Sequence, residues 1–145
     1  MRMKKLGILS IWVVLFITIF IGCGSAANSS NTTEKQIPDL TGEWKQENSN
    51  DPASYQVATI SSDTIEIYWI SDNGDTKALY WAGSFTAPTT ADEPYSWTSK
   101  NDHSKTEGAM LASNDDTKDM KYESGIISYE ASAMGVTKTI KLKKQ

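Results

Sequence analysis

Apolar and polar residues alternate in short runs over most of this chain, and a period of two is the pattern of β-strands. After Leu40, no stretch of ten or more residues shows the helical period. The clearest run is 64–70 (TIEIYWI), in which Ile65, Ile67 and Trp69 share one face. The pattern therefore predicts an all-β domain.

Asn73 and Gly74 follow this run and predict a hairpin, because both residue types tolerate a positive φ. The return strand is expected over 77–85. Alternation places four of its residues on one face: Leu79, Trp81, Gly83 and Phe85. Across the hairpin, the tryptophans would share one face and the tyrosines the other: Trp69 and Trp81, against Tyr68 and Tyr80.

Weaker alternation predicts further strands in the rest of the chain. They are expected over 41–47, 55–60, 95–99, 109–112, 118–123, 126–133 and 136–142. In the last strand Val136, Ile140 and Leu142 share one face. Eight or nine strands about ten residues apart predict an antiparallel β-barrel or β-sandwich.

The start of the chain has a different composition. Arg2, Lys4 and Lys5 precede an uncharged apolar run, 6–22, and Cys23 follows it. Secretory signal peptides typically have a basic start, an apolar run and a small residue before the cleavage site. The polar residues that follow predict a flexible tether. The expected division is a signal peptide (1–22), a lipidated cysteine with a linker (23–39) and the β domain (40–145).

The junction Phe20-Ile21-Gly22-Cys23 resembles the lipobox of bacterial lipoproteins. The resemblance implies cleavage between Gly22 and Cys23, and a diacylglycerol group, with acyl chains such as palmitate, on the Cys23 sulfur. It also implies a lipid anchor in the cell membrane, with the domain facing outside the cytoplasm. Two acyl chains hold a protein stably where one does not, since each buried methylene contributes ~0.8 kcal/mol. The residues alone leave an uncleaved membrane helix as the alternative.

The predicted first strand carries a second resemblance. Gly42 and Trp44, in the segment 40–46 (LTGEWKQ), are similar to the Gly-x-Trp opening strand of lipocalins and other calycin barrels. There the Trp plugs the closed end of an up-and-down barrel, so the likeness implies structural roles for both residues. The Thr-Gly-x-Trp-Lys start also resembles short lipoproteins of Gram-positive bacteria and their prophages, a likeness that implies no particular activity.

Charge and cysteine content narrow the classes of function. The net charge of −4 becomes −7 once the three bases before Cys23 are removed, because that segment holds no acid. An acidic domain argues against nucleic-acid binding, which needs a basic surface. One Cys and one His exclude a disulfide scaffold and a Cys/His zinc site within one chain. Neither a metal nor a cofactor is expected, apart from the lipid on Cys23.

The sequence offers little catalytic chemistry. His103 is the only imidazole, and a nucleophilic triad needs a His oriented by a carboxylate. Asp102 is its neighbour, but adjacent residues point apart, so we interpret His103 as a solvated loop residue. Clustered acids suggest calcium, but plain turn chemistry is the favoured interpretation: Asp72, Asp75, Asp92, Glu93, Asp115 and Asp116. We expect a protein that is not an enzyme.

The aromatic residues are the best candidates for binding. Small β domains fill their cores with Trp and Tyr, and Trp44, Trp69 and Trp81 suit that role. Four others are candidate ligand contacts: Tyr68, Tyr80, Tyr95 and Trp97. The first hypothesis is a surface domain that binds an extracellular peptide, glycan or protein through an aromatic patch or a barrel mouth. The alternatives are a lipocalin-like carrier of a small ligand and a prophage surface lipoprotein that acts in superinfection exclusion.

Overall fold

The computed structural model describes residues 35–133 and 135–145, which form eight strands and two short helical turns. The strands are β1 (Gly42–Gln46), β2 (Tyr55–Ser61), β3 (Thr64–Ser71), β4 (Thr76–Ser84), β5 (Tyr95–Lys100), β6 (Thr117–Glu123), β7 (Ile126–Ala133) and β8 (Val136–Lys144). The helical turns are η1 (Asp72–Gly74) and α1 (His103–Thr106). The predicted all-β fold is confirmed, whereas the signal segment and Cys23 lie outside the described residues.

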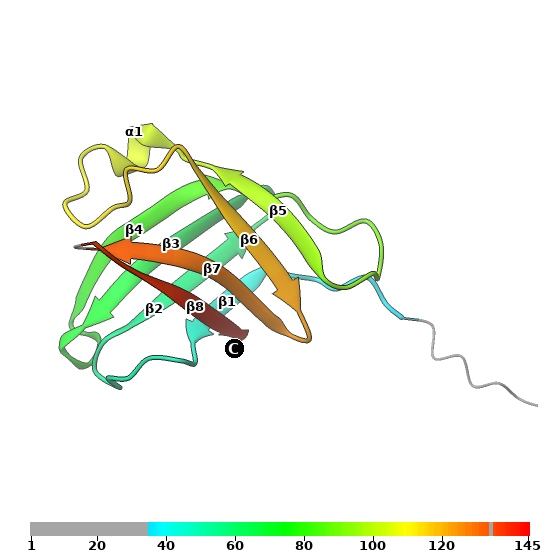
Figure 1. Cartoon of the computed structure of the whole chain (residues 1–145), viewed down its shortest axis with the longest axis horizontal. Helices are drawn as coiled ribbons and strands as arrows, with labels where there is room; N and C mark the ends of the chain where they lie inside the picture. Colours follow the sequence, from blue (N-terminus) through cyan, green and yellow to red (C-terminus); the bar gives the residue numbers. More distant parts are fainter. Residues whose placement is uncertain (1–34, 134) are drawn as a thin grey trace, which may run out of the picture. The chain divides into compact units, whose positions relative to one another are not determined.

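All eight strands belong to one sheet, in the order β4-β3-β2-β1-β8-β7-β6-β5, with every neighbouring pair antiparallel. The sheet curls into a half-barrel, so that its edge strands β4 and β5 come near each other (Figure 1). Of the two predicted architectures, the structure is therefore barrel-like, since a sandwich would need two sheets.

A contact that we call the seam joins the two edges of the sheet at a glycine. Gly83 of β4 forms an isolated bridge with Asn101, just after β5. A Cβ atom at Gly83 would lie 2.5 Å from Ser99 Oγ and 2.6 Å from the carbonyl oxygen of Lys100. Trp81 Nε1 donates to Ser99 Oγ at 3.0 Å across the same seam. Only glycine permits this approach of two backbones.

The predicted Asn-Gly hairpin is confirmed between β3 and β4. Asn73 has a φ of 58° and Gly74 a φ of 107°, the left-handed region that these two residue types tolerate. Thr76 Oγ1 donates to Asp72 Oδ2 at 2.7 Å and ties the two sides of the turn together.

A β-bulge in this hairpin changes which aromatic residues face inward. Ile67 lies opposite Trp81, but the next residue, Tyr68, lies opposite Leu79, so Tyr80 is an extra residue in β4. Tyr80 and Trp81 are both buried, at 2 % and 0 % exposure, and Leu79 shares the face of Tyr68. The predictions that Tyr80 lies on the face opposite Trp81 and that Leu79 shares the face of Trp81 are therefore wrong. The bulge shifts the alternation by one residue.

The connection between β5 and β6 contains α1 and, after it, the segment 109–112, where a strand was predicted. Residues 109–112 form a turn, so the predicted strand there is wrong. Asp102 N donates to the Ala82 carbonyl oxygen and Ser113 N to the Tyr80 carbonyl oxygen, each at 2.8 Å. The connection is thus hydrogen-bonded to β4 near its start and near its end. It covers part of the β4 edge, which does not pair with β5.

The interior of the sheet has an apolar half and a polar half. In the apolar half, Trp44 is 1 % exposed, and its Nε1 donates to the Leu40 carbonyl oxygen at 2.9 Å. Its ring meets that of Tyr122 edge-on, at 6.3 Å between centroids. The other large side chains of this half are Ile60, Ile65, Phe85, Trp97, Ile127 and Leu142. The described chain begins at this end. There the Asp39 carboxylate accepts a hydrogen bond from Thr41 N, and the Asp39 carbonyl oxygen accepts one from Lys144 Nζ.

The chain divides by its internal contacts into Met1–Thr33 and Glu34–Gln145. The second unit holds the whole sheet and the buried core described above, so we expect it to fold by itself. Within the described ranges, neither α1 nor η1 is long and apolar enough to cross a membrane.

Candidate functional site

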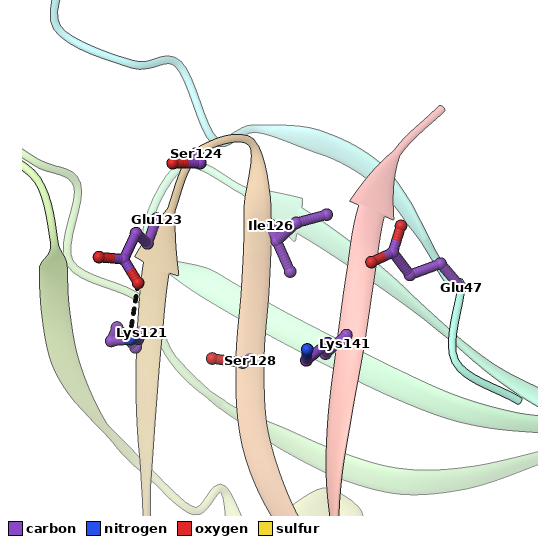
Figure 2. Close-up of a pocket in the computed structure, with 7 residues that line it drawn as sticks. All are labelled: Glu47, Lys121, Glu123, Ser124, Ile126, Ser128 and Lys141. Carbon is purple, nitrogen blue, oxygen red and sulfur yellow. Dashed lines mark hydrogen bonds and ion pairs between the residues drawn. The ribbon is translucent and has the colours of Figure 1, made fainter.

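The outer face of the sheet carries a shallow hollow over β6, β7 and β8 (Figure 2). Two of its charged side chains pair with each other: Lys121 Nζ lies 2.8 Å from Glu123 Oε2, and each of the two side chains is 48 % exposed. Glu47 and Lys141 lie on its other side (Figure 2). Exposed ion pairs of this kind contribute little free energy, so we interpret this hollow as solvated sheet surface.

An apolar pocket of about 350 Å³ lies where the α1–β6 connection crosses the ends of β3, β4 and β7. We call it the end pocket. Its lining contains no charged side chain and consists of Trp69, Tyr80, Met110, Leu111, Ala112, Ser113 and Ser132. Its volume falls in the range of small-molecule sites, about 300–1,000 Å³. Among the described pockets, it is the one with a predominantly apolar, uncharged wall.

Large apolar side chains are exposed around this end of the sheet. Met110 is 97 % exposed and Leu111 53 %, and both belong to the connection that walls the end pocket. Val136, the first residue of β8, is 68 % exposed at the same end. By the alternation of β8 it shares the face of Ile140 and Leu142, as predicted, but it is exposed where they are buried. Exposed apolar side chains that cluster in this way are typical of binding surfaces.

Aromatic rings form the inner wall of the end pocket. Trp69 and Tyr80 meet edge-to-face, with centroids 5.5 Å apart and planes at 72°. Tyr80 stacks on Tyr129 at 6.5 Å and 24°. Paired rings of this geometry attract each other beyond their burial alone, so the wall is a rigid surface.

Behind these rings lies the polar half of the interior. Gln46 and Gln56 are buried, at 8 % and 0 % exposure, and Gln56 N donates to Gln46 Oε1 at 2.9 Å. The Tyr129 hydroxyl donates to Gln56 Oε1. Two buried polar atoms, Gln56 Nε2 and the Tyr80 hydroxyl, have no hydrogen-bond partner among the described residues. Unpartnered buried groups are rare and often mark function.

The phenol of Tyr129 is held in its neutral form. Burial, together with the neighbouring Tyr80, raises its pKa well above the ordinary value of 10.0. A neutral phenol keeps its hydrogen, so Tyr129 stays a donor to Gln56 Oε1 at any physiological pH. With Tyr129 as the donor to Gln56 Oε1, the NH₂ group of Gln56 is the end without a partner among the described residues.

Lys118 brings a buried charge to the same region, at 5 % exposure. Its Nζ lies 3.1 Å from Asp115 Oδ2 and 3.3 Å from the Glu130 carbonyl oxygen. The ammonium also lies 5.4 Å from the Tyr80 ring centroid and 5.1 Å from that of Trp81, within cation–π range. Hydrogen bonds from Ser113 and then from Lys118 lower the pKa of Asp115. The buried cation is therefore paired with an ionised acid.

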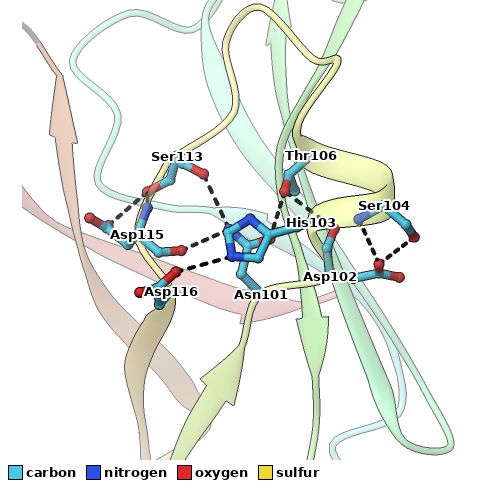
Figure 3. A network of polar contacts seen from close by, with 8 residues as sticks. All are labelled: Asn101, Asp102, His103, Ser104, Thr106, Ser113, Asp115 and Asp116. Atoms are coloured by element: carbon cyan, nitrogen blue, oxygen red, sulfur yellow. Dashed lines mark hydrogen bonds and ion pairs between the residues drawn. The ribbon is translucent and has the colours of Figure 1, made fainter.

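A polar network holds the pocket wall at its base (Figure 3). Asn101 Nδ2 donates to the carbonyl oxygens of Asp115 at 2.7 Å and Ser113 at 3.3 Å. Thr106 Oγ1 donates to Asn101 Oδ1 at 2.7 Å. These bonds fix the start and the end of the connection that carries Met110 and Leu111, so the exposed tip projects from an ordered base.

His103 belongs to this network and does not pair with Asp102. Its Nε2 lies 3.1 Å from Asp116 Oδ1, and its side chain is 53 % exposed (Figure 3). Asp102 Oδ1 instead accepts from Ser104 N at 3.1 Å and caps α1. The hydrogen bond from the Ser104 hydroxyl lowers the pKa of Asp102. His103 is thus exposed, as the solvated interpretation expects, but it is the first residue of α1 and not a loop residue.

The clustered acids form turn contacts. Asp72 accepts from Thr76, Asp92 from Thr90 and Asp115 from Ser113. Among residues 35–133 and 135–145, no group of three or more His, Cys, Asp or Glu is arranged to hold a metal ion.

The four predicted ligand contacts do not form one surface. Tyr68 lies on the outer face, where its hydroxyl donates to Glu66 Oε2 at 2.7 Å. Tyr80 lies inside and lines the end pocket. Tyr95 stacks on Trp97 at 5.8 Å, and Trp97 is 6 % exposed in the apolar half of the core. The structure brings only Tyr80 of the four to the end pocket.

The residues predicted as structural mostly lie in structural positions. Gly42 has a φ of 114° and begins β1, and Trp44 and Trp81 are fully buried. Asn73 and Gly74 form the hairpin turn. Trp69 is the exception: it is only partly buried and contributes to the end pocket.

Most of the end pocket is not predictable from the sequence pattern. The pattern predicts a strand at Met110 and Leu111, and it gives no indication of the burial of Gln56 and Lys118. One signal was available: Asp102 two residues before Ser104 is a typical helix-capping pattern, and it would have predicted α1. The burial of Gln56 and Lys118 has no local signal.

A search of protein-family models, of curated proteins and of solved structures found no match to this chain.

Proposed function

We propose that this protein is an extracytoplasmic binding domain, held at the cell membrane by a lipid on Cys23, that binds an apolar group of its ligand in the end pocket. The end pocket is the observation that carries this proposal, because it combines an uncharged wall, an aromatic inner surface and exposed apolar side chains at its rim. The binding needs no chemical step, so we propose a role without catalysis.

The position of the end pocket suits such an anchored protein. The described chain begins before β1, whereas the β3–β4 turn lies at the other end of the sheet (Figure 1). The end pocket is lined by Trp69 and Tyr80, from the two strands that this turn joins. A lipid on Cys23 would attach the chain through the predicted flexible tether that precedes β1. The end pocket would then be accessible to molecules outside the cell.

A carrier similar to the lipocalins is the second candidate, and the strand order favours it. Each strand from β1 to β8 neighbours the next in the chain except across the seam, and β1 pairs with β8, as in an up-and-down barrel. The apolar half of the interior is filled by large side chains, Trp44 and Trp97 among them. A carried ligand would therefore occupy the end pocket alone.

Binding can be tested with a neutral aromatic probe. We expect 2-acetylnaphthalene to bind the Glu34–Gln145 unit and to change the fluorescence of Trp69. Leu111→Ser should weaken this binding several-fold, because Leu111 lines the end pocket. Ile37→Ser is the matched control, since Ile37 is equally exposed, at 54 %, but does not line it. Equal affinities of the two variants would contradict the site.

The anchor needs a separate test in cells. We expect Cys23→Ala to abolish lipidation and to leave the chain unprocessed. Detergent partitioning, metabolic labelling with a fatty acid and the mass of the mature chain would measure both effects. Cys23→Ala chains that still mature to residue 23 and still carry a fatty acid would contradict the lipid anchor, whatever the result of the probe experiment.

A further inference from the structure

We propose that the ligand of the end pocket is a small uncharged molecule with a planar apolar body and a hydrogen-bond acceptor, such as a carbonyl oxygen, to which Tyr80 donates. This inference rests on the proposed binding function and names the class of ligand for the same site.

The first support is the free-energy cost of burying the Tyr80 hydroxyl without a hydrogen-bond partner. Tyr80 is 2 % exposed, and its hydroxyl is buried without a partner among the described residues. A phenylalanine would fill the same space and keep the contacts with Trp69 and Tyr129, without an unpaired polar group. Packing alone therefore does not account for a tyrosine in the wall of the end pocket. A partner that arrives with the ligand does.

The second support is the type of partner that is missing. Tyr129 donates to Gln56 Oε1, so the unpartnered end of Gln56 is its NH₂ group, which only donates. The Tyr80 hydroxyl also carries a hydrogen to donate. Both unpartnered groups can donate, so each calls for an acceptor. Because the Tyr80 hydroxyl is covered from solvent, the ligand's acceptor reaches it only when the side chains over it move as the ligand enters the end pocket.

The third support is the charge of the site. The wall of the end pocket has no charged side chain. The ammonium of Lys118, beside the Tyr80 ring, is already bound by Asp115 and by the carbonyl oxygen of Glu130. A charged ligand would lose its hydration without gaining an ion pair. A neutral acceptor avoids this penalty.

The shape of the wall indicates the body of the ligand. The rings of Trp69 and Tyr80 meet at 72°, so they form an angled aromatic wall on which an aromatic or other planar group can pack against one ring. Met110 and Leu111 also line the pocket, as exposed side chains at its rim. Methionine adapts its shape to different apolar partners, so the outer part of the ligand is expected to be less strictly selected than its acceptor.

Three naphthalenes test the proposal by titration calorimetry on the Glu34–Gln145 unit. They share one ring system and differ in one group: 2-acetylnaphthalene has a neutral acceptor, 2-isopropylnaphthalene has none and 2-naphthoate is an anion. We expect the acetyl compound to bind about fivefold more tightly than the isopropyl compound, the gain from one net hydrogen bond. The anion should bind most weakly of the three.

Two tyrosine variants assign the donor. Tyr80→Phe should unfold at the same or a higher temperature than wild type, and should bind the acetyl and isopropyl compounds equally. Tyr68→Phe, which removes a hydroxyl on the outer face, should keep the fivefold preference. A merely structural Tyr80 would leave that preference unchanged.

The outcomes separate the two proposals. Equal binding of the acetyl and isopropyl compounds by wild type overturns the ligand class but leaves a binding pocket, and this comparison needs no variant. A preference that survives Tyr80→Phe overturns the role of Tyr80. If none of the three compounds binds at millimolar concentration, the proposed binding function itself fails.

Discussion

Closure of the curled sheet depends on the absence of a side chain at Gly83. A methyl group there would lie 2.5 Å from Ser99 Oγ, 2.6 Å from the Lys100 carbonyl oxygen and 2.7 Å from Trp81 Nε1. All three distances are below any normal carbon contact, and one of these atoms belongs to the backbone. Gly83→Ala must therefore move β4 away from β5.

The cost of that movement has two parts. Overpacking a well-packed site costs about 1–3 kcal/mol. Separation of the strands also lengthens the 3.0 Å bond from Trp81 Nε1 to Ser99 Oγ, and a buried donor without its acceptor costs a further 1–3 kcal/mol, roughly. We expect Gly83→Ala to lower the free energy of unfolding by about 3 kcal/mol. For a domain of this size, this corresponds to about 15 °C in melting temperature.

Urea denaturation followed by tryptophan fluorescence measures the effect, with Gly108→Ala as the matched control. A Cβ atom at Gly108 meets nothing within 4 Å, and its φ is not in the left-handed region. The control should therefore be neutral or slightly stabilising, by less than about 1 kcal/mol. If the two variants unfold at the same urea concentration, the close approach of β4 and β5 at Gly83 does not contribute to the stability of the domain.

Two further effects on stability follow from single contacts. Hydrogen bonds from Lys105 and then Tyr68 hold the pKa of Glu66 below its ordinary value of 4.5, so they stabilise the fold above pH 4.5, and this stabilisation disappears as the pH falls through the lowered pKa. Glu66→Gln should thus lower the free energy of unfolding by less than about 1 kcal/mol at neutral pH and should leave it unchanged in strong acid. Urea denaturation at the two pH values measures this difference. An equal loss of stability at the two pH values would contradict the link between the pKa of Glu66 and folding. Trp44→Phe should cost about 1 kcal/mol more than Trp97→Phe in thermal unfolding, because the Trp44 N–H has a backbone acceptor and the Trp97 N–H has none among the described residues.

Local sequence patterns predicted the elements that depend on local physics. The Asn73-Gly74 turn forms because those two residues accept a positive φ, whatever lies around them. The strand 126–133 was predicted with its observed bounds, and most others within two residues. The predicted strand over 109–112 failed because a short apolar run has no distinct period, and there capping by Asp102 and contacts with β4 decided the outcome.

The candidate site could not be predicted in the same way. The wall of the end pocket comes from β3, β4, β7 and the α1–β6 connection, which are far apart in the sequence. Strict alternation placed Tyr80 on the face opposite Trp81, and a bulge of one residue leaves both residues buried inside. A bulge depends on how β3 and β4 pair as the sheet curls, so it leaves no clear local signal.

By itself, the sequence determined the antiparallel β architecture, because side-chain alternation and turn chemistry act over a few residues. It also holds the lipobox-like segment that predicts an anchor on Cys23, a prediction that lies outside the described residues. Only the tertiary structure decided the closure at Gly83, the burial of Gln56 and Lys118, and the assembly of the end pocket. These features depend on the curvature of one sheet. The curvature brings the two edges of the sheet together and makes one of its faces an interior, which has an apolar and a polar half.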